Sequence, residues 1–462
     1  MMNTAIHACS MLVTLWGCVA WLSVTGCGRP ATHTGGQTIG IVVGDSMAPT
    51  LKGSHRKLVC ADCRFRYDVA DAIETSQPEK LVCPNCGNVQ PATIVADKGS
   101  PDEVYINELQ AIRRWDVVAF RYPEGQSNGQ EYGIKRVVGL PGEVLEIVDG
   151  NLFVSSSDSN PTQPIDFIGD PERPARMILR KSWPLQKRIR MLVFDSSYSP
   201  QSGVPPRLKP AQQPSNWHAT GTTNRFHRDP SSRTRTDSAD ESEWDWLNYH
   251  HWRCCDHAGG RDQDHPVEDV DSFNVSLGRR LNPMDELFLE LSVQPDAHAV
   301  WGWQFQHGDD TYRFTCDETS RQITVTHMNR LHQSDVWEVI NFPSSAPTRR
   351  KRRTIECSSF DQRLIVVING ELVFARNLPQ RSGAVAEYPL QIGGQSGALR
   401  LDRFRLWRDV YFLSTGREPN KLSAGPAGYI VLGDNVPVSV DSRHWASVSV
   451  PAESIIGPVE LK

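Results

Sequence analysis

The sequence lacks a strong excess of charge of either sign. Its 462 residues include 49 Lys and Arg against 54 Asp and Glu, giving a formal net charge of −5. This balance gives no reason to expect a nucleic-acid partner. Long helical patterns are also scarce, whereas short β-branched runs, 34 glycines and 31 prolines are frequent. These features predict a mostly β protein with roughly two to four domains.

A disulfide framework of the kind found in small secreted domains is also absent. The eleven cysteines fall into an N-terminal apolar group, two C-x-x-C pairs and a later group. The later group includes the sequence HHWRCCDH at 250–257, whose residue types can bind metal but whose spacing matches no standard site.

The two C-x-x-C pairs predict a structural zinc ribbon over residues 55–98. The pairs are separated by nineteen residues and consist of Cys60, Cys63, Cys83 and Cys86. Four thiolates at this spacing can close a tetrahedral zinc site, which leaves no open position for catalysis. Two disulfides are the alternative, because the compartment can be oxidising.

The N-terminal segment 1–36 is predicted to be a membrane anchor. Residues 5–27 carry no charge, and about 20 apolar residues suffice to cross a bilayer as one helix. A cleaved secretory signal, a lipoprotein signal modified at Cys27 and a buried core helix are the alternatives. The first three interpretations place the remaining chain outside the cytoplasm.

The stretch GDSMAPTL at 44–51 raises the first question about chemistry. The apolar run 41–43 ends at Gly44, and Pro49 soon interrupts any regular element. This pattern predicts a strand end that delivers Ser46 to a sharp turn. A serine in a turn often only hydrogen-bonds the local backbone, so this stretch alone does not identify a nucleophile.

Besides the Ser46 stretch, which is the first block, the sequence has two further blocks: residues 115–143 are the second and residues 429–448 are the third. The sequence WDVVAFRYP at 115–123 predicts a strand, and EYGIKRVVGLPGE at 131–143 places Lys135 within another strand. Lysines in strands usually extend to solvent. The third block, 429–448, contains a strand, a Gly-Asp-Asn turn and a Ser-x-Asp-Ser-Arg sequence. By itself this third block predicts a polar loop with an Asp–Arg pair.

Together the blocks resemble the bacterial type I signal peptidases, membrane-anchored serine proteases that remove signal peptides from exported proteins. The first family motif is matched by Ser46, Met47, Pro49, Thr50 and Leu51. The strand motifs are matched within 116–120 and 135–142. The last motif is matched by Gly433, Asp434, Asn435, Ser439, Asp441, Ser442, Arg443 and Trp445. The motifs follow the family's order and cover residues 1–54, about 99–155 and 425–462.

The resemblance implies a catalytic dyad that needs no cofactor. A serine hydroxyl is a poor nucleophile until a base takes its proton, and lysine is a base only when neutral, a form that burial favours. By resemblance, Ser46 is the nucleophile, Lys135 is the general base and Ser439 orients the lysine. Three further residues are implied to brace the site: Asp434, Asp441 and Arg443.

Gly44 stands two residues before Ser46, where some relatives carry a hydroxyl that binds the oxyanion. Oxyanion stabilisation would therefore rest on the backbone N–H of Ser46.

The resemblance also implies partners and a location. The expected substrates are exported precursors that carry a signal peptide with small side chains at the first and third positions before the cut. The expected location is the bacterial cytoplasmic membrane, where a single-pass anchor contacts lipid and the catalytic domain lies on the outer face.

A large insert, 156–424, interrupts the predicted peptidase core, which comprises 37–54, 99–155 and 425–462. Its residues 196–240 have the composition of a flexible lead-in. From about residue 270, short strands separated by turns predict an antiparallel β-sandwich similar to laminin-G or concanavalin-like domains. Trp301 and Trp303 are expected to pack in its core.

The predicted architecture is thus a signal-peptidase-type β domain that follows one transmembrane helix and is interrupted by the ribbon and the sandwich. The alternative function is a catalytically weak or inactive surface scaffold whose sandwich binds glycan or protein.

Overall fold

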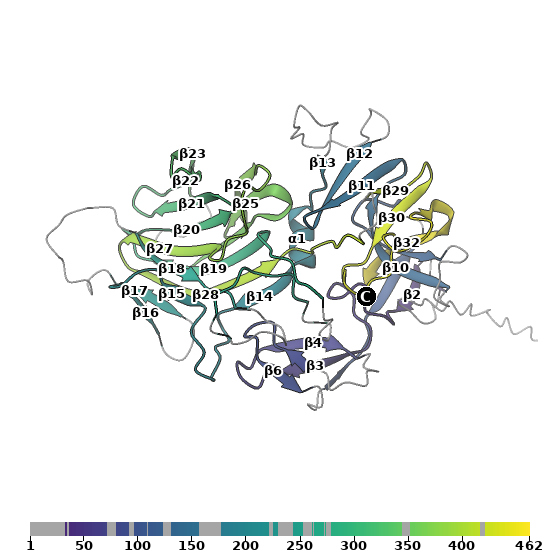
Figure 1. The fold of residues 1–462 in the computed structure, drawn as a ribbon, viewed down its shortest axis with the longest axis horizontal. Helices are drawn as coiled ribbons and strands as arrows, with labels where there is room; N and C mark the ends of the chain where they lie inside the picture. The colour runs from purple at the N-terminus through teal and green to yellow at the C-terminus, as the bar shows by residue number, and fades with distance from the viewer. Residues whose placement is uncertain are drawn as a thin grey trace, which may run out of the picture.

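A computed structural model describes most of the chain. The described residues are 33–34, 37–71, 80–91, 97–108, 110–122, 131–156, 177–220, 225–229, 244–252, 261, 263–271, 273, 279–343, 352–415 and 421–462. Within this part, α1 (Trp183–Ile189) is the only α-helix, and nearly all other regular elements are strands (Figure 1). The predicted mostly β character is confirmed.

An eight-stranded antiparallel sheet unites segments from the two ends of the chain. Its order is β1-β2-β8-β32-β9-β10-β30-β31. The strands are β1 (His33–Thr34), β2 (Gln37–Ile41), β8 (Glu103–Asn107), β9 (Val117–Arg121), β10 (Tyr132–Gly139), β30 (Gly428–Leu432), β31 (Val450–Pro451) and β32 (Ile455–Leu461). The pairing of β10 with β30 brings the second and third sequence blocks together.

A four-stranded sheet adjoins the first and connects it to the insert. Its order is β13-β12-β11-β29. The strands are β11 (Glu143–Val148), β12 (Asn151–Ser156), β13 (Met177–Ile178) and β29 (Lys421–Ser423). The sequence placed β13 and β29 in the insert, but both strands pair within this sheet, because two or three residues are too few to show a pattern. One apolar cluster, including Leu145, Ile430 and Leu432, joins the two sheets.

The insert contains two large antiparallel sheets that enclose one apolar core. The first has the order β16-β17-β28-β19-β24-β25-β26, with β14 also on β28, and the second has the order β15-β18-β27-β20-β21-β22-β23. The strands of the first sheet are β14 (Met191–Asp195), β16 (Trp217–Ala219), β17 (Phe226–Arg228), β19 (Leu287–Pro295), β24 (Arg353–Ser358), β25 (Arg363–Ile368), β26 (Glu371–Asn377) and β28 (Leu399–Arg408). Those of the second are β15 (Leu208–Pro210), β18 (Asp245–Tyr249), β20 (Val300–His307), β21 (Asp310–Asp317), β22 (Gln322–Met328), β23 (Ser334–Asn341) and β27 (Leu390–Ser396).

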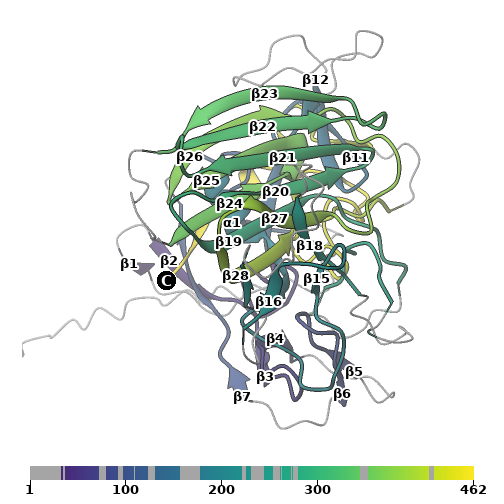
Figure 2. The ribbon, with the colours of Figure 1, turned by 90° about the vertical axis from the view of Figure 1, so that its left-hand side faces the viewer.

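Apolar residues alternate along these strands, and their side chains fill the core between the two sheets. Trp301 and Trp303 are fully buried, as expected, and Trp303 stacks on Phe314 with ring centroids 4.9 Å apart. The second sheet faces the viewer in Figure 2. Two 3₁₀ turns complete the fold: η2 (Phe360–Gln362) in the insert and η3 (Ala452–Ser454) before β32.

The cysteine-rich segment forms two small sheets below the other units in Figure 1. The strands are β3 (His55–Val59), β4 (Arg66–Ala70), β5 (Lys80–Val82), β6 (Val89–Pro91) and β7 (Asp97–Gly99). Its cysteine loops dock on the insert. Asn85 donates to the Tyr198 carbonyl at 3.0 Å and accepts from the Asp195 N–H at 2.6 Å. Asp62 accepts from the Ser202 N–H at 2.9 Å and from its hydroxyl at 2.7 Å.

The structure does not test the predicted membrane anchor. Residues 5–27, including Cys27, lie outside the described residues. Among the described residues, no helix is long and apolar enough to span a membrane. The anchor therefore stays a prediction.

Candidate active site

Ser46 lies on a turn that two buried apolar side chains hold in place. After β2 the chain continues through the buried Val42 and turns at Gly44. Ser46 follows two residues later and is only partly buried. Met47 is fully buried and Leu51 is 3% exposed. Both pack in one cluster with residues of β8, β9 and β10. The apolar neighbours thus fix the backbone while Ser46 itself stays partly exposed.

Lys135 meets this serine from the middle of β10. All eight residues of the strand are buried, and Lys135 is 1% exposed. Its Nζ lies 2.7 Å from Ser46 Oγ and donates to it, and it also lies 3.2 Å from the Ile134 carbonyl. The first distance is within the reach expected of a nucleophile and its base, about 2.6–3.2 Å. The structure therefore brings together two groups that are remote in sequence.

The turn after β30 clamps the Ser46 loop. The Asn435 N–H donates to the Ser46 carbonyl at 3.0 Å, and its side-chain amide donates to the Asp45 carbonyl at 2.9 Å. A Cβ atom at Gly433 would lie 2.4 Å from the Ser46 carbonyl oxygen and 2.2 Å from Ser439 Oγ. Only glycine fits there, so the Gly-Asp-Asn turn is shaped around the serine.

Ser439 lies beside this clamp, but its hydroxyl does not make the hydrogen bond to the lysine that the resemblance implies. Its side chain is buried, and its hydroxyl makes no hydrogen bond to any described residue. Buried hydroxyls are normally satisfied. The group lies next to Gly433 and the Ser46 carbonyl, close to the dyad but not bonded to Lys135.

Asp434 forms a buried ion pair with Arg136, the residue after the lysine. Arg136 Nε donates to Asp434 Oδ1 at 2.8 Å and Arg136 NH2 donates to Oδ2 at 2.6 Å. The Thr50 hydroxyl also donates to Asp434. These three residues therefore tie the three sequence blocks together. Arg136 and Thr50 were not among the predicted site residues, although their places within the motifs were a usable signal.

The second predicted brace, Asp441 with Arg443, is also a buried ion pair. Arg443 Nε donates to Oδ1 and its NH2 donates to Oδ2, both at 2.8 Å. Asp441 also accepts from the Gly433 N–H at 3.0 Å. Burial alone would raise the pKa of the Asp441 carboxyl, but the Arg443 guanidinium and the hydrogen bonds hold it well below its ordinary value. The pair therefore stays ionised and supports the Gly433 turn.

Asp45, directly before the serine, has a perturbed carboxyl group. Burial raises its pKa from 3.8 to about 6, the positive charge of His55 opposes the shift, and the negative charge of Asp71 reinforces it. Its Oδ1 is buried and accepts no hydrogen bond from the described residues. A titrating group therefore lies next to Ser46.

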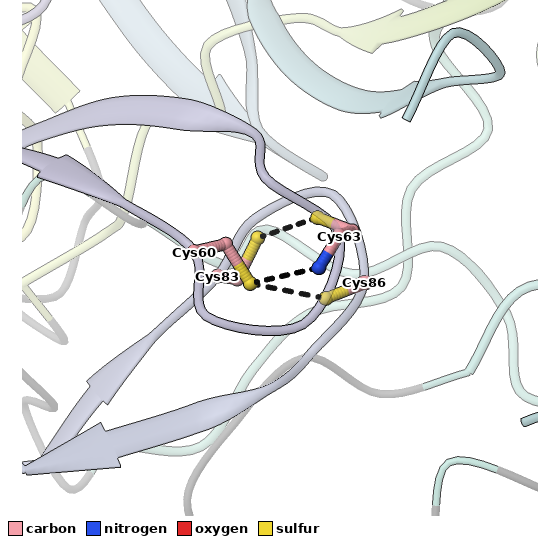
Figure 3. A group of neighbouring side chains, drawn as sticks. All are labelled: Cys60, Cys63, Cys83 and Cys86. Atoms are coloured by element: carbon pink, nitrogen blue, oxygen red, sulfur yellow. Dashed lines mark hydrogen bonds between the residues drawn. The ribbon is translucent and has the colours of Figure 1, made fainter. Parts of the chain in front are cut away.

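The four cysteines of the ribbon lie close together and fit a zinc ion (Figure 3). The Sγ–Sγ distances are 3.6 Å for Cys60–Cys86 and 3.7 Å for Cys63–Cys83. A tetrahedral site with Zn–S bonds of about 2.3 Å has sulfur atoms about 3.8 Å apart, whereas a disulfide requires about 2.05 Å. All four are free thiols in the structure, so the arrangement suits metal and not two disulfides.

Other clusters of potential ligands are explained differently. In the HHWRCCDH sequence, His250 pairs with Asp264 at 2.8 Å, and the cysteines lie outside the described residues. Among the described residues, the remaining group of ligand type is Glu286, Asp361 and Asp409. Lys181 already supplies a cation to that group, 2.8 Å from Asp409 Oδ2.

Comparison with known proteins gives one family match. Residues 39–173 match the family model described as signal peptidase, peptidase S26. The matched segment contains Ser46, Lys135 and the ribbon, and it supports a peptidase at the level of the family. No curated protein matches the chain.

Several solved β structures are weakly similar to the chain. Galectin LEC-6 of Caenorhabditis elegans is 13% identical over 27% of this chain and 83% of the galectin, with a TM-score of 0.22. Carbohydrate-binding module CBM66 of Bacillus subtilis is 9% identical over 44% of this chain and 92% of the module, with a TM-score of 0.23. The botulinum neurotoxin serotype D binding domain is 9% identical over 48% of each chain, with a TM-score of 0.28. Scores this low carry no argument about ligand or function.

Proposed function

We propose that this protein is a Ser–Lys endopeptidase that cleaves signal peptides from exported precursor proteins, held at the membrane by its N-terminal segment. The observation that carries this proposal is the 2.7 Å separation of Lys135 Nζ and Ser46 Oγ. Both residues lie in the segment that matches the signal peptidase family model, which supports the choice of substrate class.

The proposed reaction begins with Lys135 as a neutral amine, a form that its burial favours over the ammonium ion. Lys135 takes the Ser46 proton as Ser46 Oγ attacks the scissile carbonyl carbon. The lysine then gives this proton to the leaving amine, and an acyl-enzyme remains. Lys135 next takes a proton from water as the water attacks the ester carbonyl carbon. It gives this proton to Ser46 Oγ when the ester C–O bond breaks, which releases the acid product and restores both groups. Backbone N–H groups of the Ser46 turn are the proposed oxyanion donors, because Gly44 offers no side chain.

The surrounding residues act by positioning. Asn435 fixes the backbone carbonyls of Asp45 and Ser46. The Arg136–Asp434 pair holds the turn after β30 against β10. The Asp441–Arg443 pair supports Gly433 from the other side. These contacts keep the serine and lysine in register, which is the main requirement of a dyad.

Zinc has no role in this chemistry. Cys60, Cys63, Cys83 and Cys86 would hold it as a structural ion that stabilises the ribbon fold, because all four thiolates are used as ligands.

The test uses the full chain in detergent and a precursor with an Ala-x-Ala cleavage site. Ser46→Ala and Lys135→Ala are expected to lower kcat/KM by about 10³-fold or more, since both groups act in one step. Ser54→Ala and Lys57→Ala are matched controls, because both side chains are exposed. The controls should give the mature product at the wild-type rate. Equal product from all variants would contradict the proposal, because cleavage would then not depend on Ser46 or Lys135. No product from the wild type would also contradict it and would favour an inactive scaffold.

A further inference from the structure

The outer face of the seven-stranded sheet in the insert has an unusual composition. Its inner face is apolar and includes Trp301, Trp303 and Phe305. Its outer face, which is toward the viewer in Figure 2, carries the alternate residues of β18, β27, β20 and β21. Five of them, together with Trp244 directly before β18, form what we call the tryptophan–amide platform: Trp244, Trp246, Asn248, Gln304, Arg313 and Gln391. All six side chains are partly exposed.

The polar part of the platform is one row across four neighbouring strands. The register places Asn248 opposite Gln391, Gln391 opposite Gln304, and Gln304 opposite Arg313. Gln391 donates to Asn248 Oδ1 at 2.5 Å, Gln304 donates to Gln391, and Arg313 Nε donates to Gln304 Oε1 at 3.0 Å. Each glutamine amide has two N–H groups and two lone pairs, so each retains one donor and one acceptor beyond the contacts of the row.

The aromatic part lies beside this row. Trp244 and Trp246 stack with centroids 4.6 Å apart and an interplanar angle of 12°. The Arg313 guanidinium lies 5.5 and 5.1 Å from the two ring centroids. A Cβ atom at Gly393 would lie 2.5 Å from Trp246 Cε3, so the indole lies against the bare strand. Gly393 pairs with Gly302 on the next strand, so the surface beside the indole bears no side chain on these two strands.

We propose that the tryptophan–amide platform binds an oligosaccharide. A sugar ring has an apolar C–H face, which can pack on an indole, and a rim of hydroxyl groups, which need both donors and acceptors. Indole rings beside fixed amides supply both kinds of contact, in the pattern of aromatic walls with a few oriented polar groups. Neighbouring strands lie about 4.8 Å apart, so the row spans about 14 Å, enough for roughly two to three linked sugar rings.

The charges favour a sugar over a single-stranded nucleic acid, which can also stack on tryptophan. Nucleic-acid binding needs several Lys or Arg side chains for the phosphates. The platform has Arg313, and the row gains Lys209 opposite Asn248 on β15. One guanidinium and one lysine suit hydroxyl groups or a single acidic sugar better than a chain of phosphates.

The test is binding of the full chain in detergent to a printed array of neutral and acidic oligosaccharides, with a thymidine 12-mer as the nucleic-acid probe. Retained sugars are then titrated while tryptophan fluorescence is followed. We expect at least one class of oligosaccharide to bind. Trp246→Ala and Gln304→Ala should weaken binding by about tenfold or more, whereas Trp246→Phe should keep part of it because a ring remains.

Two control variants separate this site from other features. Trp337→Ala removes a tryptophan of β23 that also has an arginine, Arg376, over its ring at 4.0 Å but lies outside the platform. It should bind like the wild type, provided that thermal melts show it folded. Ser46→Ala should also bind normally, so loss of proteolysis and loss of sugar binding remain distinguishable.

Three results would overturn the proposal. The first is that no arrayed oligosaccharide binds the wild type. The second is that folded Trp246→Ala and Gln304→Ala bind as tightly as the wild type. The third is that the 12-mer, and no sugar, is retained through Trp246.

Discussion

At the scale of single residues, Asp45, directly before the proposed nucleophile, has a carboxyl group whose protonation affects the stability of the fold. Burial raises its pKa from 3.8 to about 6, so the folded state holds this proton more tightly than the unfolded state. The carboxylate therefore destabilises the fold above pH 6, and the effect is relieved as the pH falls through 6 toward 3.8.

Asp45→Asn should consequently stabilise the protein at neutral pH. The expected gain in the free energy of unfolding is about 1 kcal/mol at pH 7.5, a value reduced because solvent screens a partly exposed group. Little gain is expected at pH 4. Urea unfolding at both pH values measures the difference, with the exposed Glu453→Gln as a control. A gain that is the same at pH 4 and pH 7.5 would contradict the assignment.

At the scale of elements, the ribbon depends on its four thiols more than on apolar packing. Its buried cluster comprises eight residues, of which four are the cysteines. So small a core gives little stability of its own, and a metal usually supplies the remainder. The cysteine loops also carry Asp62 and Asn85, which hydrogen-bond the insert. Loss of metal should therefore loosen the contact between the ribbon and the insert.

Purified protein should contain about one zinc per chain. Removing it with a chelator, or replacing Cys60 and Cys86 with serine, should lower the melting temperature and expose residues 195–202 to limited proteolysis. Elemental analysis and a protease time course measure these effects, and added zinc should restore the wild type only. A metal-free protein with four oxidised thiols and an unchanged melt would instead indicate disulfides.

At the scale of the whole molecule, Lys181 joins the four-stranded sheet to the insert. It lies between β13 and α1, and its amine contacts Asp361 of η2 and Asp409 at the end of β28. Glu286 completes the acidic group. Burial raises the pKa of the Asp409 carboxyl to about 6, although Lys181 opposes the shift. The lysine thus compensates several buried carboxyl groups at the junction.

Lys181→Met should destabilise the protein by about 3–5 kcal/mol, since it leaves buried charges unpaired. Without the cation the carboxyl groups hold protons more tightly when folded, so the loss should be larger at pH 8 than at pH 5. Denaturant unfolding at both pH values measures it. Lys187→Met on α1 is the control, because its pair with Glu356 is partly exposed. A smaller loss at pH 8 than at pH 5 would show that the acidic group does not depend on Lys181.

The three units also meet beside the proposed nucleophile. Ala48 of the Ser46 turn packs against Ala70 of the ribbon and Phe273 of the insert. The Ala70 N–H donates to the Phe273 carbonyl at 2.9 Å. The positions of the two inserts in the sequence would allow them to make no contact with the core. Instead, both inserts contact the turn that carries Ser46 or a residue that packs against it.

The sequence by itself determined the features that short windows encode. Alternation of apolar residues determined the mostly β character and the buried Trp301 and Trp303, and the C-x-x-C spacing determined the four-thiol cluster. Local motifs also pointed to Ser46 and Lys135, and to Asp441 with Arg443 only two residues away. Each of these depends on neighbours within one strand or one turn.

Only the tertiary structure decided which distant residues meet. The partner of Asp434 is Arg136, Lys181 serves Asp361 and Asp409, and the tryptophan–amide platform draws one polar residue from each of four strands. Ser439 lies near the dyad without the predicted bond to Lys135. The physical reason is that strand pairing and register depend on the packing of the whole sheet, and no short stretch of sequence carries that information.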